Sequence, residues 1–93
     1  MAGILQNLRQ KIVDRDYYLS SHAEEEMLND AFERSDVENA IFKGKIDKRM
    51  TKDPRGLRYR IEGPGNDGRL MHVLCRLDEE NRLRIITVYA LEE

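Results

Sequence analysis

The sequence predicts an α+β fold, a single domain in which N-terminal helices pack on one face of a four-stranded antiparallel meander. Apolar residues recur with helical spacing up to residue 43, and the period changes to two after Gly44. Two Ser-x-x-Glu motifs mark helix starts within the first part. The 93 residues are enough for one domain with one thin core. We therefore expect the helices within residues 1–43 and the sheet within 44–93.

The residues before Gly44 predict three helices and one short extended segment. Residues 3–13 carry the apolar stripe of an amphipathic helix. Residues 17–19 are β-prone, and we expect them to be extended. Ser21-His22-Ala23-Glu24 predicts a capping box at the start of the second helix, with Ser21 as the cap. Ser35-Asp36-Val37-Glu38 predicts another for the third helix, which Gly44 would end.

The second half of the chain predicts four strands. Residues 45–52 alternate with few apolar positions and are expected at an edge, whereas 57–62 predict a half-buried strand. Residues 69–77 and 83–91 are more continuously apolar, which is typical of central strands. The hairpin between these two has an open register, because its loop could hold two, three or four residues. A slip of one residue would exchange the two faces of the strand.

Charge is distributed unevenly along a chain whose net charge is −2. Residues 1–42 hold 4 basic and 9 acidic side chains, and residues 77–93 hold 2 and 5. Residues 43–76 hold 10 basic and 4 acidic side chains. The sheet is therefore expected to produce a local positive field on an acidic protein, which favours an anionic partner such as RNA.

Several classes of protein are disfavoured by the same sequence. Cys75 is the only cysteine, so an intramolecular disulfide is excluded, and we expect it to be a small buried side chain. The N-terminal segment lacks the apolar core of a signal peptide, and no run approaches the ~20 apolar residues of a membrane span. We therefore expect a cytoplasmic protein without membrane contact.

A metal site is also not expected. Zinc ligands could be drawn from His22, Glu26 and His72, but distant segments would have to converge without any recognised ligand spacing. We expect no cofactor and a structural role for His72 in the middle of a strand.

His22 is the sharpest candidate for catalysis. It follows the expected cap at the positive end of a helix dipole, where a neutral imidazole is favoured and can act as a general base. The alternative is that its ring packs beside Tyr17 or Tyr18 and supports the cap.

Basic and aromatic residues of the strands are candidates for binding nucleic acid. Guanidinium groups bind phosphate through paired hydrogen bonds, and tyrosine rings can stack on unpaired bases. The candidate set is Lys48, Arg58, Arg69, Arg76 and Tyr59, and the side chains expected on the open face are Arg58, Arg60, Arg76, Thr87 and Tyr89. The alternative is that these arginines solvate an edge and pair with Glu62, Asp47 or the C-terminal acids.

Several short motifs, taken in order, resemble the bacterial domain-of-unknown-function 4258 family from about Tyr17 to Leu91. They are Ser21-His22-Ala23, Met27, Asp36-Val37-Glu38-Asn39-Ala40-Ile41, Gly44, the strand around Tyr59, and Ile86-Thr87-Val88-Tyr89. That family is similar in layout to the compact ribonuclease toxins of the RelE and barnase-like group. The resemblance implies that His22, Arg60, Thr87 and Tyr89 line a catalytic face.

One departure from the family pattern bears on activity. The family usually has an arginine beside Met27, where this chain has Glu26 preceded by Glu25. Acidic residues near a phosphate site repel the substrate.

Three hypotheses follow. The first is a toxin-like or vestigial, metal-independent endoribonuclease or RNA-binding protein, in which His22 deprotonates a ribose 2′-hydroxyl, Arg60 and Arg76 stabilise the phosphate, and Tyr89 positions a base or proton. The second is a non-catalytic protein-interaction module, working as a homodimer or in a two-gene complex. The thin core and Glu25/Glu26 motivate it. The third, a metal-dependent enzyme, has the weakest support.

Overall fold

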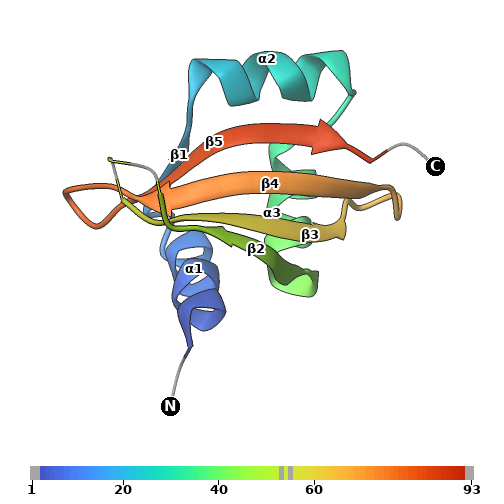
Figure 1. The fold of residues 1–93 in the computed structure, drawn as a ribbon. Helices are drawn as coiled ribbons and strands as arrows, with labels where there is room; N and C mark the ends of the chain where they lie inside the picture. Colours follow the sequence, from blue (N-terminus) through green and yellow to red (C-terminus); the bar gives the residue numbers. More distant parts are fainter. Residues whose placement is uncertain (1–2, 53, 55, 92–93) are drawn as a thin grey trace.

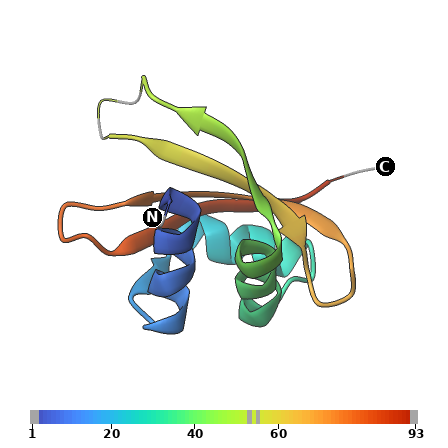
Figure 2. The ribbon, with the colours of Figure 1, turned by 90° about the horizontal axis from the view of Figure 1, so that it is seen from below.

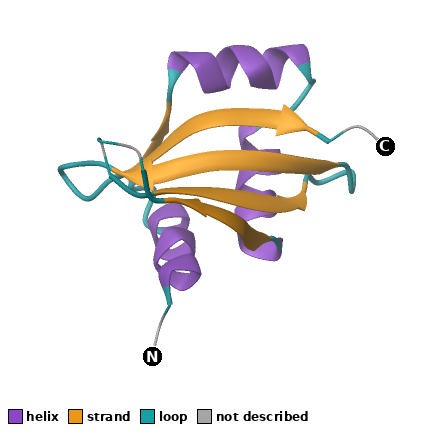
Figure 3. Cartoon of the chain, viewed as in Figure 1, coloured by secondary structure: helices purple, strands orange, loops and turns teal. Residues whose placement is uncertain are grey.

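The computed structural model describes residues 3–52, 54 and 56–91, which form three helices and a five-stranded mixed sheet (Figures 1 and 3). The α+β class is confirmed. The strand order in the sheet is β1-β5-β4-β3-β2. The elements are α1 (Ile4–Val13), β1 (Tyr17–Leu19), α2 (Ser21–Asn29), α3 (Arg34–Lys43), β2 (Lys45–Met50), β3 (Arg58–Pro64), β4 (Leu70–Leu77) and β5 (Leu83–Ala90).

The four-stranded meander is wrong in one respect, because β1 adds a fifth strand parallel to β5. Tyr17 lies opposite Leu83, and Leu19 lies opposite Ile85. The strands β2 to β5 do form the expected antiparallel meander, with β2 at an edge and β4 and β5 central. A three-residue strand has no periodicity to reveal its partner, and this partner lies more than sixty positions away in the chain.

Both predicted capping boxes are displaced toward the N-terminus. The cap of α2 is Ser20, whose hydroxyl accepts a hydrogen bond from the Ala23 amide at 3.0 Å and donates one to the Ile86 carbonyl of β5 at 2.8 Å. The cap of α3 is Glu33, which exchanges hydrogen bonds with Asp36. Two adjacent serines can both be read as the cap of α2, and the contact with β5 favours Ser20.

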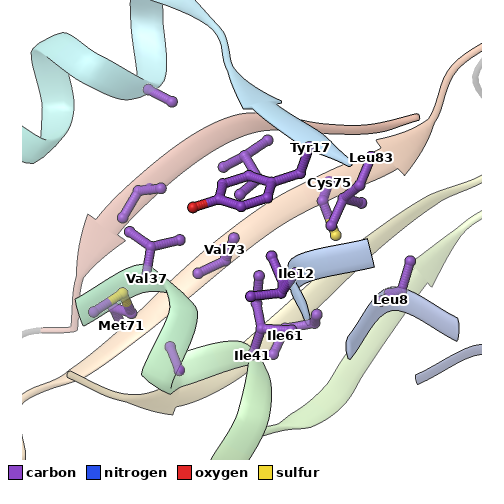
Figure 4. Close-up of a cluster of buried hydrophobic side chains, with 14 of the residues drawn as sticks. Leu8, Ile12, Tyr17, Val37, Ile41, Ile61, Met71, Val73, Cys75 and Leu83 are labelled. Carbon is purple, nitrogen blue, oxygen red and sulfur yellow. The ribbon is translucent and has the colours of Figure 1, made fainter. Parts of the chain in front are cut away.

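The core lies between the sheet and the helices α1 and α3, which cover one face of it (Figure 2). Its largest fully buried side chains include Leu8, Ile41, Ile61, Met71 and Leu83 (Figure 4). Cys75 is buried among them, as expected, and burial raises the pKa of its thiol to about 12. The helix α2 lies along β5. No helix in the described part of the chain is long and apolar enough to cross a membrane.

One hairpin and one bulge determine which side chains of β4 and β5 reach the open face. Leu77 pairs with Leu83, and the Asp78 amide donates to the Arg82 carbonyl at 2.8 Å, which leaves residues 79–81 at the tip of the hairpin. In β5, Leu74 faces Thr87 while Cys75 faces Ile85, so Ile86 is an extra residue. This bulge allows Ile85 and Val88 to enter the core while Thr87 and Tyr89 lie on the opposite face.

Candidate functional site

A row of three polar side chains crosses the centre of the open face. Glu62 of β3 lies opposite His72 of β4, which lies opposite Tyr89 of β5. His72 Nε2 is 3.1 Å from Glu62 Oε1, and His72 Nδ1 is 2.9 Å from the Tyr89 hydroxyl. The imidazole and phenol rings meet edge to face, with centroids 5.2 Å apart. Both ring nitrogens of His72 therefore have partners on neighbouring strands.

The partners of His72 limit which hydrogen-bond roles its two ring nitrogens can take together. When Nε2 carries a proton, it donates that proton to the Glu62 carboxylate, which as an ionised group can only accept. In the neutral ring Nδ1 is then an acceptor, and the Tyr89 hydroxyl donates to it. In the protonated ring Nδ1 also donates, and the Tyr89 oxygen accepts. The row can thus pass a proton between Tyr89 and Glu62 by changes in hydrogen position alone.

Arg60 and Asp47 lie beside this row. Asp47 is the extra residue of a bulge in β2, because Ile46 pairs with Ile61 while Lys48 pairs with Arg60. Its Oδ2 atom accepts from Arg60 Nε at 2.7 Å and lies 3.6 Å from His72 Nε2. The hydrogen bond to Arg60 holds the pKa of Asp47 below its usual value and raises that of Arg60. The site therefore combines a carboxylate pair, an imidazole, a phenol and a guanidinium group.

Three further arginines continue the open face away from this row. Arg76 of β4 lies directly opposite Arg84 of β5, and Arg58 of β3 occupies the adjacent register position, one residue before the Tyr59–Cys75 pair. Like charges placed opposite one another across strands repel, and a bound anion relieves that repulsion. This end of the face therefore gathers three positive charges, beside the hairpin acids Asp78, Glu79 and Glu80.

The structure separates His22 from these residues. His22 lies on α2, its side chain is 61% exposed, and its Nε2 is 3.0 Å from Glu26 Oε1. The helix α2 lies along β5, two strands away from Arg60 on β3. The predicted grouping of His22 with Arg60 is therefore not found, whereas Thr87 and Tyr89 lie on β5, the strand along which α2 packs. The zinc ligands drawn from the sequence do not converge either, because His72 lies on the open face with Asp47 and Glu62.

The other predicted residues fall into two groups. Thr87 lies on the open face opposite Leu74, and Lys48 lies exposed on β2 opposite Arg60. Tyr59, however, is only 7% exposed and packs in the core, so its interpretation as a base-stacking residue does not fit. Arg69 connects the β3–β4 loop to the end of α2.

Arg69 is held by four contacts. It donates to the carbonyls of Asp30 at 2.9 Å and Ala31 at 3.1 Å, and to the Asp67 carboxylate at 2.7 Å. Its guanidinium also lies 4.3 Å from the centre of the Phe32 ring. These contacts indicate a structural role in place of the predicted contact with nucleic acid.

Sequence reasoning considered Asp47 and Glu62 only as ion-pair partners of the arginines, as Asp47 is for Arg60, and took His72 as structural. A signal was present, since His72 is a polar residue flanked by the apolar Met71 and Val73 near the middle of a largely apolar strand. The β3–β4 pairing then places Glu62 opposite it. Asp47 gave no such signal, because a bulge directs it to the site.

Comparison with known protein families shows to which family the chain belongs. Residues 19–90 match the family described as Domain of unknown function (DUF4258). The chain belongs to this family. The match begins at Leu19, so α1 lies outside it, as the DUF4258 resemblance in the sequence indicated. Neither the curated proteins nor the solved structures include a significant match to the chain.

Proposed function

We propose that this DUF4258 protein binds RNA on the open face of its sheet and cleaves it without a metal ion. The observation that carries the proposal is the hydrogen-bonded row Glu62–His72–Tyr89 beside Arg60. Acid–base groups next to a fixed cation are what cleavage of a phosphodiester by its own 2′-hydroxyl requires. The same proposal includes a similarity in layout to RelE and barnase-like ribonuclease toxins and a cytosolic location.

The reaction begins at the ribose 2′-hydroxyl. The Glu62 carboxylate takes the proton, and the 2′-oxygen forms a bond to phosphorus as the bond from phosphorus to the 5′-oxygen breaks. The products are a 2′,3′-cyclic phosphate and a 5′-hydroxyl. Arg60, which has N–H groups beyond those that bind Asp47, stabilises the charge that develops on the phosphate oxygens.

The leaving 5′-oxygen takes its proton from Tyr89. With His72 protonated, the Tyr89 oxygen replaces that proton from His72 Nδ1, 2.9 Å away. Glu62 has then gained one proton and His72 has lost one, and exchange with water restores both. The reaction therefore uses Glu62 as the general base and Tyr89, resupplied by His72, as the general acid.

RNA cleavage in EDTA by matched variants tests this proposal. Glu62→Gln and His72→Gln keep similar shapes, and each is expected to lower the cleavage rate about 100-fold or more. Tyr89→Phe is expected to lower it less, since water can supply the final proton. His22→Ala removes a histidine outside the row and is expected to leave the rate unchanged. Equal inactivity of the wild type and Glu62→Gln on mixed-sequence RNA would contradict catalysis.

A second candidate function rests on the exposed apolar surface of α2. Leu28 is 82% exposed beside a hollow of about 330 Å³ lined by Leu19, Met27 and Phe32. We propose as the alternative a non-catalytic interaction module that forms a homodimer or a two-gene complex through this helix. A monomer in sedimentation velocity that co-purifies with no partner would argue against it.

A further inference from the structure

We propose that Asp47, Glu62 and His72 form a binding site for a divalent transition-metal ion, with Zn²⁺ the best fit. One imidazole nitrogen and two carboxylate oxygens are a donor set that zinc accepts. The three ligand atoms lie within 4.8 Å of one another. Three protein ligands leave a fourth position for water, as in zinc sites that bind a further molecule.

The distances fit a small ion. His72 Nε2 lies 3.1 Å from Glu62 Oε1 and 3.6 Å from Asp47 Oδ2. A tetrahedral zinc ion with ligands at about 2.0–2.1 Å keeps its ligand atoms about 3.3 Å apart. The ligand atoms can therefore close around the ion with small side-chain rotations.

The orientation of His72 supports the same conclusion independently. A metal-binding imidazole usually bonds through its other nitrogen to a second group, which fixes the ring. Tyr89 lies 2.9 Å from Nδ1, so Nε2 is directed at the two carboxylates. In the metal-bound state Nε2 carries no proton, and Nδ1 donates its proton to the Tyr89 oxygen. The His22–Glu26 pair on α2 has only two ligands and a histidine that is 61% exposed, so it serves as the competing site in the test.

Arg60 competes with the ion for Asp47. Its guanidinium binds Oδ2, the same oxygen that faces His72, at 2.5 Å and 2.7 Å. An ion that takes this oxygen must displace the arginine, whose side chain is 27% exposed and can turn toward solvent. If the proposed ribonuclease reaction is correct, the ion also occupies Glu62 and His72, and Zn²⁺ is expected to inhibit cleavage.

Calorimetric titration of ZnCl₂ into the metal-free chain, without RNA, tests the site. We expect one ion per chain with micromolar affinity, at least about tenfold weaker in Asp47→Asn and Glu62→Gln. Arg60→Gln is expected to bind more tightly, because Asp47 loses its competitor. His22→Ala is expected to bind like the wild type. No binding at millimolar ZnCl₂, or binding lost in His22→Ala and kept in Glu62→Gln, would overturn the proposal.

A measurement on the wild-type protein tests the site even if some of these variants do not fold. The ring signals of His72 in a proton–nitrogen NMR spectrum are expected to move on addition of one equivalent of ZnCl₂, and movement at His22 alone would refute the site. Because neither experiment contains RNA, an inactive ribonuclease leaves the metal result intact. Conversely, a failure to bind zinc leaves the cleavage result in EDTA intact.

Discussion

Ala40 lies where α3 and β3 are so close that the neighbouring Gly44 and Gly63 have no room for a side chain. A Cβ atom added to Gly63 would collide with the carbonyl oxygen of Ala40, and one added to Gly44 would collide with that oxygen and with the Glu62 carbonyl. Gly44 has an ordinary φ of −89°, so its role is to leave space for this approach. These contacts fix the distance of β3 from α3 and hence the position of Glu62.

Gly63→Ala is expected to destabilise the fold by roughly 1–3 kcal/mol, because α3 must move away from β3 to make room. Gly3→Ser is the matched control, since nothing lies within 4 Å of the added carbon and serine is a favourable helix cap. Urea denaturation of both variants measures the free energy of unfolding. An unchanged value for Gly63→Ala would show that the close contact is not tight in solution.

Single residues also show how far the sequence can predict the site. The alternation of strand residues indicated that Arg60, Thr87 and Tyr89 share one face, and the structure places them there. Their neighbours Asp47 and Glu62 depend on a bulge and on strand pairing, which single-strand periodicity does not contain. The exposed position of His22 depends on how α2 docks on the sheet.

The helix α2 is joined to the sheet through its N-cap. The Ser20 hydroxyl bonds to the Ala23 amide within the helix and to the Ile86 carbonyl at the bulge of β5. The Ser20 amide also donates to the Ile85 carbonyl at 2.9 Å. One residue therefore starts the helix and holds it against the strand that carries Thr87 and Tyr89.

Ser20→Ala is expected to lower the free energy of unfolding by about 1–2 kcal/mol, because both hydroxyl bonds are lost. Ser21→Ala should change it by less than about 0.5 kcal/mol, since Ser21 is the exposed first residue of the helix. Thermal denaturation of the two variants distinguishes the caps. A larger loss for Ser21→Ala would restore the assignment made from the sequence.

At the level of helices and strands, the sequence predicted each helix and each strand of the meander, with ends displaced by a few residues. Period and capping chemistry are local, so they are readable without the fold. The parallel pairing of β1 with β5 is non-local, because residues between α1 and α2 meet the last strand. No local sequence pattern predicts this strand pairing.

Considered as a whole, the molecule has a thin core in which two titratable groups keep their protons. Burial, with a hydrogen bond to Glu38, raises the pKa of Tyr17 to about 12. Burial alone raises that of Cys75 to about 12. The unperturbed pKa values are 10.0 for Tyr17 and 9.0 for Cys75. As pH rises, the unfolded chain therefore releases these protons at a lower pH than the native protein. Above pH 9 the unfolded state therefore binds fewer protons than the native state, and stability falls as pH rises.

The stability contributed by these two groups is expected to be fully present below pH 9 and to decline up to about pH 12. Denaturant unfolding at a series of pH values from about 8 to about 11, roughly one unit on each side of the unfolded pKa values, measures how steeply stability falls. Tyr17→Phe removes one of the groups and is expected to make the decline shallower. A stability that is constant across this range would contradict the buried states of both groups.

The open face brings together the acid–base row, Arg60 and the three further arginines, and the proposed function places RNA across this face. The decisive measurement is titration with a 2′-O-methyl oligoribonucleotide, which cannot be cleaved, followed by proton–nitrogen NMR. If RNA binds there, we expect shifts at Arg60, His72 and Tyr89 that weaken with added salt. Shifts confined to α2 around His22, or no shifts at low salt, would contradict it.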